Sequence, residues 1–396
     1  DGGGAGGEQE QLEFTPDTVL EQLQVVFTTR SNEARRRAHV FLKHFVHSED
    51  AWTVADQMLR GANDVAGGDA MLRERVAHFG ATALTTKLAH AFHELPADAH
   101  DDLRQSLFEH VHTYAGGPRT VRNQLSLGVA MLAVQMPTWT DTIVNDIVSL
   151  LPSTDGPGML ASQLGALGEL PHVLGGHRVD IAPERRHALW QVIGAAAVDV
   201  VRHLATCLEA CGDDADVQRL VLVCFHNWLR YARLPTDTDA LLDNPLVSAC
   251  FQALASDTLF EPAVECCVEL IGRARVDQSH GAALANEVVP LALALKPTDE
   301  PLCPDDEKEA VGHAQIFTAL GRRFMGTILD CGDEAMIIVG ALLDLARHES
   351  VNVLVASTSF WARLADRLRV EKMEIPVIVD PAADDDAAAA GGAAGG

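Results

Sequence analysis

The feature that most constrains the fold is a helical hydrophobic period that runs through nearly the whole chain. From about residue 14 to residue 373, apolar side chains recur three or four positions apart, which places them on one face of an α-helix. No stretch alternates apolar and polar residues between turn signals, as a half-buried β-strand would. The sequence therefore predicts an all-α protein.

Capping residues and helix breakers divide this period into sixteen expected helices. Thr15, Ser31 and Ser48 are expected to be the N-caps of the first three helices. A long fourth helix is expected over 70–94, and Pro96 should stop it. The remaining helices are expected at about 97–115, 118–136, 139–151, 157–170, 183–211, 214–233, 238–255, 258–275, 278–295, 304–330, 333–348 and 351–373.

These helices form pairs at intervals of about 40 residues, which is the period of HEAT-type repeats. One pair cannot bury its own apolar face, so neighbouring pairs must stack to form a continuous core. We therefore expect a right-handed α-solenoid of antiparallel helix pairs, an ARM/HEAT superhelix. The core of this stack should contain all five tryptophans: Trp52, Trp139, Trp190, Trp228 and Trp361.

The two ends of the chain differ from this helical body in composition. Residues 1–13 are rich in Gly, Glu and Gln, and residues 375–396 in Ala, Gly and Asp, so we expect both segments to be disordered. Between them we expect three groups of HEAT repeats, over 14–95, 96–260 and 261–374. The first residue is not Met and the last pair lacks a polar capping repeat. We therefore expect the N-terminal portion of a longer protein.

The charge balance restricts the kinds of partner. The chain has 30 Lys and Arg but 56 Asp and Glu, a net charge of −26, which argues against direct nucleic-acid binding and favours a basic protein partner. The sequence has no run of about 18 uncharged apolar residues, so we expect no membrane span. The acidic residues that could face a basic partner, or simply start helices on solvated loops, are Asp213, Asp214, Asp216, Asp305, Asp306 and Glu307.

The sequence contains no motif that predicts catalysis, a cofactor or a metal site. It has no phosphate-binding Walker loop, no His-Glu-x-x-His and no Gly-x-Ser-x-Gly, so we expect no enzyme and no cofactor. His90 with His93, and His110 with His112, have no further ligand at a suitable spacing. The eight cysteines include no Cys-x-x-Cys, and we expect reduced core cysteines of a cytosolic or nuclear protein.

Three runs of residues resemble a known family. Residues 51–59 have the form Ala-Trp-x-x-Ala-Asp-Gln-x-Leu, residues 91–96 are Ala-Phe-His-Glu-Leu-Pro, and residues 124–139 end in Gln-Met-Pro-Thr-Trp. These runs resemble the N-terminal region of importin-β-type karyopherins, and most of all their transportin-SR and importin-13 branch. The resemblance covers about residues 14–370. It departs from the family pattern at residues 80–82 and at Met131.

The resemblance implies a nuclear transport receptor that shuttles between cytoplasm and nucleus. Its cargo would be a basic protein, such as an arginine-serine-rich splicing factor, and Ran-GTP would control its release. Phenylalanine-glycine nucleoporins would be further partners. A HEAT-repeat scaffold, such as a phosphatase regulatory subunit, and an export receptor of the same superfamily remain as alternatives.

The resemblance also suggests where Ran-GTP would bind. Lys87, on the expected helix 70–94, matches a lysine of the family and is the first candidate contact; the alternative is a solvated lysine on an exposed face. Gln124 and Gln135 share one face of the following inner helix. They are expected either to contact Ran or to hold the packing between repeats.

Overall fold

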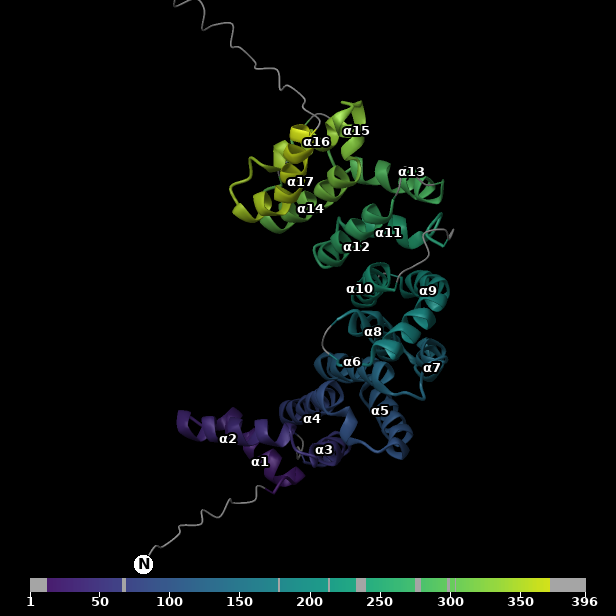
Figure 1. The fold of residues 1–396 in the computed structure, drawn as a ribbon. Coiled ribbons are helices and arrows are strands. Elements are labelled where there is room, and N and C mark those ends of the chain that lie inside the picture. The colour runs from purple at the N-terminus through teal and green to yellow at the C-terminus, as the bar shows by residue number, and fades with distance from the viewer. Residues whose placement is uncertain are drawn as a thin grey trace, which may run out of the picture. The chain divides into compact units, whose positions relative to one another are not determined.

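The computed structural model describes residues 13–65, 69–176, 179–212, 214–232, 240–274, 279–297, 300–302 and 304–370. Over these residues it contains seventeen α-helices, three short 3₁₀ helices and no strand (Figure 1). The chain divides into two compact units, residues 1–295 and residues 296–396. The expected disordered ends fall almost wholly outside the described residues, and the expected repeat-group boundaries after residues 95 and 260 stay predictions.

The first unit is a stack of helix pairs. Its helices are α1 (Pro16–Thr28), α2 (Asn32–Val46), α3 (Ala51–Val65), α4 (Ala70–His90), α5 (His100–Tyr114), α6 (Arg119–Gln135), α7 (Ile143–Leu150), α8 (Pro157–Gly175), α9 (Pro183–Cys211), α10 (Ala215–Tyr231), α11 (Pro245–Ala253), α12 (Phe260–Arg273) and α13 (Ser279–Leu293). Consecutive helices pair from α1 with α2 to α11 with α12, and α4, α6, α8, α10 and α12 also pack on one another in a continuous layer (Figure 1). This arrangement confirms the expected all-α solenoid of helix pairs.

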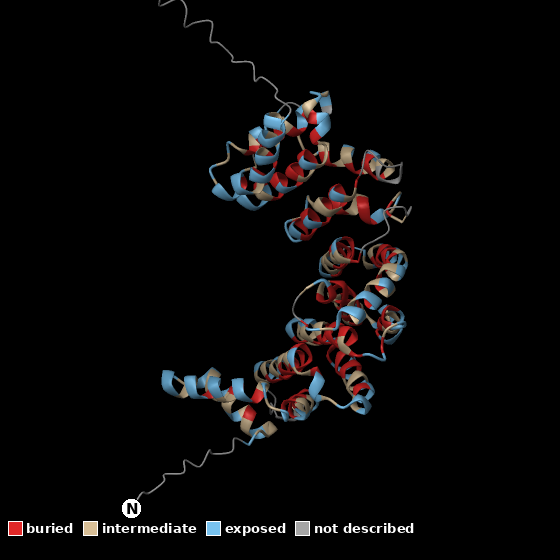
Figure 2. Ribbon diagram, viewed as in Figure 1, coloured by how far each residue is buried: buried red, intermediate tan, exposed pale blue. Residues whose placement is uncertain are grey.

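The layer of second helices is held by close approach and by hydrogen bonds between neighbouring repeats. A Cβ added at Gly168 of α8 would lie 3.2 Å from the Cα of Cys224 in α10, so a larger residue would require α10 to shift by a few tenths of an ångström. The indole Nε1 of Trp228 donates to the carbonyl of Leu167 at 2.8 Å, and Asn227 donates to the carbonyl of Gly168 at 3.0 Å. Figure 2 shows that this layer contains much of the buried surface of the unit.

Arg185, at the start of α9, reaches a helix that belongs to an earlier pair. Its guanidinium donates to the carbonyls of Ala133 at 2.8 Å and Val134 at 2.6 Å, at the C-terminal end of α6. The last carbonyls of a helix have no donor within their own helix. The arginine supplies that donor, which avoids the cost of burying an acceptor without a hydrogen bond. The pair α7 and α8 lies between α6 and α9 in the chain order, so this contact bypasses one repeat.

The second unit contains α14 (Glu307–Arg323), α15 (Met325–Leu329), α16 (Asp333–Leu345) and α17 (Val351–Val370). α17 packs mainly on α14, and Lys296 forms an ion pair with Asp344 of α16 at 2.8 Å. The single helix expected over 304–330 is wrong. Phe324 leaves the helical conformation (φ −103°, ψ 31°), which divides the segment and turns Met325 and Ile328 into the core.

The capping signals are only partly confirmed. Thr15 and Ser31 accept hydrogen bonds from the first turns of α1 and α2, as expected. Ser48 does not cap α3, because its hydroxyl donates back to the carbonyl of Phe45 at 2.8 Å. The helix expected over 70–94 ends at His90, and a 3₁₀ turn at Phe92–Glu94 follows.

α9 is long and apolar enough to cross a membrane by length and composition alone, but it packs as a helix of the repeats. It is 29 residues long and includes an 18-residue window of mean hydropathy 1.3. Its apolar face packs on α8, α10 and α11, and its surface includes the exposed pair Asp199 and Arg202, 2.7 Å apart. This helix is therefore part of the stack of helix pairs.

Tryptophan burial is more varied than the sequence predicts. Trp139 and Trp228 are fully buried, in agreement with the expectation. Trp52, Trp190 and Trp361 are only half-buried, so their assignment to the core is wrong in part. Trp52 is half-buried because its indole contacts polar side chains: its Nε1 donates to Glu94, and its ring lies beside Lys87.

Candidate partner-binding surface

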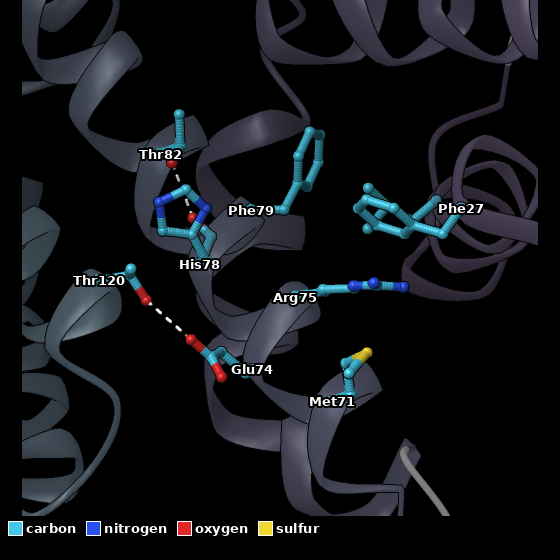
Figure 3. Close-up of a pocket in the computed structure, with 9 residues that line it drawn as sticks. Phe27, Met71, Glu74, Arg75, His78, Phe79, Thr82 and Thr120 are labelled. Carbon is cyan, nitrogen blue, oxygen red and sulfur yellow. Dashed lines mark hydrogen bonds between the residues drawn. The ribbon is translucent and has the colours of Figure 1, made fainter.

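A pocket of about 450 Å³ opens between α1, α4 and the start of α6 (Figure 3). We call it the N-terminal pocket. Leu23 and Phe27 come from α1, because the last two turns of that helix face α4. The other lining residues come from the first half of α4 and from α6: Met71, Glu74, Arg75, His78, Phe79, Thr82 and Thr120.

Two large apolar side chains of the pocket remain accessible to solvent. Phe27 is 45% exposed and Met71 is 61% exposed. Scattered apolar residues are normal on protein surfaces, but two that line one concavity indicate a place where a partner could bury them. Phe79 forms the inner wall and stacks on Phe45 of α2, with ring centroids 6.0 Å apart.

The charges of the pocket are arranged asymmetrically. The guanidinium carbon of Arg75 lies 4.2 Å from the centroid of the Phe27 ring, and in Figure 3 it points toward that ring. Glu74, the adjacent residue, turns the other way, and its Oε1 accepts a hydrogen bond from Thr120 Oγ1 at 3.1 Å. Within the described part of the chain, no carboxylate forms an ion pair with Arg75.

Lys87 is buried, so the exposed position considered for it is wrong. Its side chain is only 1% exposed, its ammonium pairs with Glu94, and it lies 5.5 Å from the centroid of the Trp52 ring. Trp52 Nε1 also donates to Glu94 Oε2 at 3.3 Å. This arrangement exists because α4 ends early, which lets the chain turn back and place Glu94 over the lysine. The hydrogen bond from Lys87 lowers the pKa of Glu94 below its ordinary value.

Gln124 and Gln135 serve the packing between repeats. Gln124 donates to the hydroxyl of Thr85, and Gln135 donates to the carbonyl of Leu88; both acceptors lie on α4. The two side chains are half-buried. Of the two roles that the sequence left open, the structure therefore shows the structural one, and contact with Ran stays a prediction.

The acidic candidates mostly start helices. Asp214 accepts from the backbone N–H groups of Asp216 and Val217, each at 3.1 Å, and so caps α10. Asp306 caps α14 in the same way, accepting from the backbone of Glu309 at 3.0 Å. Asp213 lies outside the described residues.

Of the other acidic candidates, Asp216 and Glu307 are accessible and have polar partners, whereas Asp305 is simply exposed. Asp216 lies 3.6 Å from Arg119 and keeps 83% of its side chain exposed. Glu307 accepts hydrogen bonds from Ser350 and Asn352, both at 2.7 Å, and these bonds lower its pKa. Asp305 lies in the bend before α14 and is exposed.

A polar cluster that the sequence did not predict joins α3 to α5. His110 Nε2 lies 2.7 Å from Asp56 Oδ1, Ser106 donates to the same carboxylate, and Arg60 pairs with it at 2.9 Å. Burial would raise the pKa of Asp56, but the hydrogen bonds from His110, Ser106 and Arg60 hold it well below its usual range. Ser106 Oγ also lies 3.4 Å from His110 Nε2, and both side chains bond to the same carboxylate oxygen, so the cluster links α5 to α3. Among the described residues, no group of His, Cys, Asp and Glu is placed to hold a metal ion.

The sequence alone does not predict the pocket, because Phe27 belongs to an apolar stripe at helical spacing on α1, a pattern typical of residues that face a core. One signal was available. Met71, Arg75, His78 and Thr82 recur at helical spacing on α4, so they share a face that is neither wholly apolar nor wholly polar.

Comparison with known proteins supports the resemblance. Residues 118–267 match the family described as exportin 1-like protein. Transportin MOS14 of Arabidopsis thaliana is 29% identical over 357 residues, which cover 88% of this chain and 35% of that protein. Importin-13 of Bos taurus is 26% identical over 380 residues, 92% of this chain and 38% of the relative.

The chain therefore spans little more than a third of the length of these relatives. Both relatives are named as transport proteins rather than as enzymes. The matched segment runs from α6 into α12 and so covers the centre of the stacked layer. The stacked helix pairs, the exportin 1-like segment and these relatives all agree with the resemblance to importin-β-type karyopherins that the sequence motifs suggest.

Proposed function

We propose that the protein is a nuclear transport receptor that moves between cytoplasm and nucleus, with protein as its cargo and Ran-GTP as its regulator. The observation that carries this proposal is the match to importins and a transportin along about nine tenths of the chain. The stacked pairs support it, because each repeat contacts mainly its neighbours and small rotations add along the stack. A partner that prefers one curvature can then expel a partner that prefers another.

The surface proposed for Ran-GTP lies on α4 and α6 around the N-terminal pocket. Phe27, Met71 and Arg75 are accessible there and can make direct contacts. Lys87, Gln124 and Gln135 are proposed to support this surface from within, because they fix α4 against its neighbours.

The remaining partners follow from charge and from the family. A net charge of −26 favours basic cargo, including arginine-serine-rich splicing factors, and the exposed Asp216, Asp305 and Glu307 are proposed contacts for basic surfaces. Phenylalanine-glycine nucleoporins are proposed to bind between the first helices of the pairs. A groove of about 730 Å³ between α9 and the segment that leads into α11 is available for such contacts.

The test is binding of the chain to Ran loaded with GTP and to Ran loaded with GDP, each at two salt concentrations. The proposal expects strong preference for the GTP form, weakened by salt because surface charges are screened over about 8–10 Å. Met71→Asp should weaken binding, whereas Arg363→Glu, on an exposed position of α17, should not. Equal binding of both nucleotide forms would contradict the proposal and favour a plain HEAT scaffold.

An export receptor is the second candidate, and the exportin 1-like match over residues 118–267 favours it. The two candidates differ in the sign of one coupling. Ran-GTP should lower the affinity for cargo in an import receptor and raise it in an export receptor, which a cargo-binding titration with and without Ran-GTP measures directly.

A further inference from the structure

We propose that the N-terminal pocket binds a linear peptide in which a large apolar side chain stands next to an aspartate or glutamate. This inference goes beyond the transport function, because it concerns a peptide site that requires neither Ran nor a bound nucleotide. The argument has an apolar half and an anionic half.

The apolar half comes from the walls of the pocket. Its volume of about 450 Å³ falls within the range of about 300–1,000 Å³ that is typical of small-ligand pockets. Leu23 and Phe79 form the inner wall, and Phe27 and Met71 stand at the rim with much of their surface in water. One aromatic or long aliphatic side chain would bury all of these surfaces together, and the flexible methionine can adapt to its shape.

The anionic half comes from Arg75. Its guanidinium stacks on the Phe27 ring, which holds the planar group in one orientation and leaves its N–H edge available. A carboxylate is the natural acceptor for that edge, because both oxygens can bond in parallel. Glu74 cannot supply it, since its carboxylate is turned to Thr120 on α6. The acceptor must therefore come from the ligand.

The neighbouring helix extends this preference for anions. α2 begins shortly after Phe27, and Arg36, Arg37 and Lys43 are exposed on it without a carboxylate partner in the described part of the chain. Figure 2 shows that most of α2 is exposed. Acidic residues flanking the anchoring pair would meet this positive potential.

A peptide fits these features better than a nucleic acid does. Nucleic-acid binding needs several cations spaced along a phosphate backbone. The pocket offers one stacked arginine beside an apolar hollow, which suits a single carboxylate joined to an apolar group. Elsewhere the protein carries a large excess of negative charge, which opposes a long polyanion more strongly than a short peptide.

The test uses the full chain and a fluorescein-labelled probe peptide, Gly-Glu-Glu-Trp-Glu-Glu-Gly, with binding followed by fluorescence anisotropy in the absence of Ran. Two control probes replace the Trp by Ala or every Glu by Lys. Only the first probe should bind, and raising the salt concentration should weaken it. If the probe without Trp, or the lysine probe, binds equally well, the proposal is overturned.

Variants of the protein separate the two halves of the site. Arg75→Glu should weaken the acidic probe at least about tenfold, the effect of losing a charged pair worth ~1.4 kcal/mol. Met71→Asp should weaken it as well, and at a position 61% exposed it should leave the fold intact. Arg363→Glu is the matched control, an exposed arginine on α17 without an ion pair in the described residues. Wild-type affinity in both pocket variants, with unchanged circular dichroism, would overturn the proposal.

Discussion

α8 and α2 are each the second helix of their pair, but α8 is mostly buried and α2 is mostly exposed. α8 lies between α6 and α10, and most of its residues are buried. α2 packs on α1 and only lightly on α4, and it buries just Ala38, Leu42 and Phe45. The sequences record the difference, because α8 has Glu169 as its one carboxylate and no Lys or Arg, whereas α2 contains four Lys and Arg residues.

The comparison teaches that neighbours, rather than the repeat itself, decide what a helix can tolerate. A helix covered on two sides has lost its polar face and depends on close packing. A helix covered on one side keeps a face that is free to acquire charge, and thus to select partners. The predictions below probe this contrast from the most enclosed position to the most open one.

The largest effect is expected where α10 meets α8. Trp228→Ala should lower the free energy of unfolding by about 3–5 kcal/mol, because it leaves a cavity and removes the donor to Leu167. Chemical denaturation followed by circular dichroism measures this loss. Trp361→Ala, at a half-buried position of α17, is the comparison variant and should cost less. Equal losses would break the link between enclosure and stability.

Lys87→Glu should be the next most harmful. The variant replaces a buried ion pair by two carboxylates that face each other, and the expected loss is roughly 2–3 kcal/mol. Loss of Ran binding in this variant would therefore report partial unfolding of α4 as well as any lost contact. Lys87→Met, which keeps the aliphatic stem without the second negative charge, should recover part of the stability. A melting temperature equal to that of wild type in both variants would show that the pair contributes nothing.

Asp56 should give a smaller and pH-dependent effect. Its pKa is lower in the folded chain than the ordinary value of about 3.9, so the carboxylate stabilises the fold above that pH. The stabilisation should disappear as the pH falls below about 4 toward the folded pKa. Asp56→Asn should cost about 1 kcal/mol at pH 7, and the difference from wild type should shrink in acid. A difference that grows in acid would contradict the assignment.

The smallest effect is expected on the open face of α2. Val40→Ala and Arg36→Ala should each change the free energy of unfolding by no more than about 0.5 kcal/mol, because both side chains are exposed. Thermal melting of the two variants beside wild type provides the measurement. A loss above about 1 kcal/mol would show that something covers this face in solution.

The repeat architecture could be predicted from the sequence, whereas the surface could not. Helical spacing and breakers identify the stack because they act locally, and α9 (Pro183–Cys211) has the predicted bounds. The end of α4 was missed because Ala91 has no helix-breaking character of its own, and the chain leaves the helix there to place Glu94 against Lys87. For the same reason Lys87 was expected on the surface, since the burial of one side chain depends on where a later segment folds back.

The N-terminal pocket is even harder to predict from the sequence. Phe27 fits the apolar stripe of its helix, and only the limited coverage of α1 leaves it in water. Gln124 and Gln135 were correctly placed on one face of α6, but their partners on α4 depend on how two repeats are rotated. The face of a helix on which a residue lies follows from local spacing and can be predicted. The contacts between repeats depend on how the repeats are rotated, and they cannot be predicted in this way.

The arginine that links α9 to α6 affects how the stack comes apart. In a stack with strictly nearest-neighbour coupling, each repeat could open almost independently of the repeats beyond its neighbours. Arg185 ties the end of α6 to α9 across the intervening pair, so α6 cannot fray there without releasing α9 as well. Amide hydrogen exchange should therefore report one cooperative block from α6 to α9, flanked by repeats that open at lower free energy.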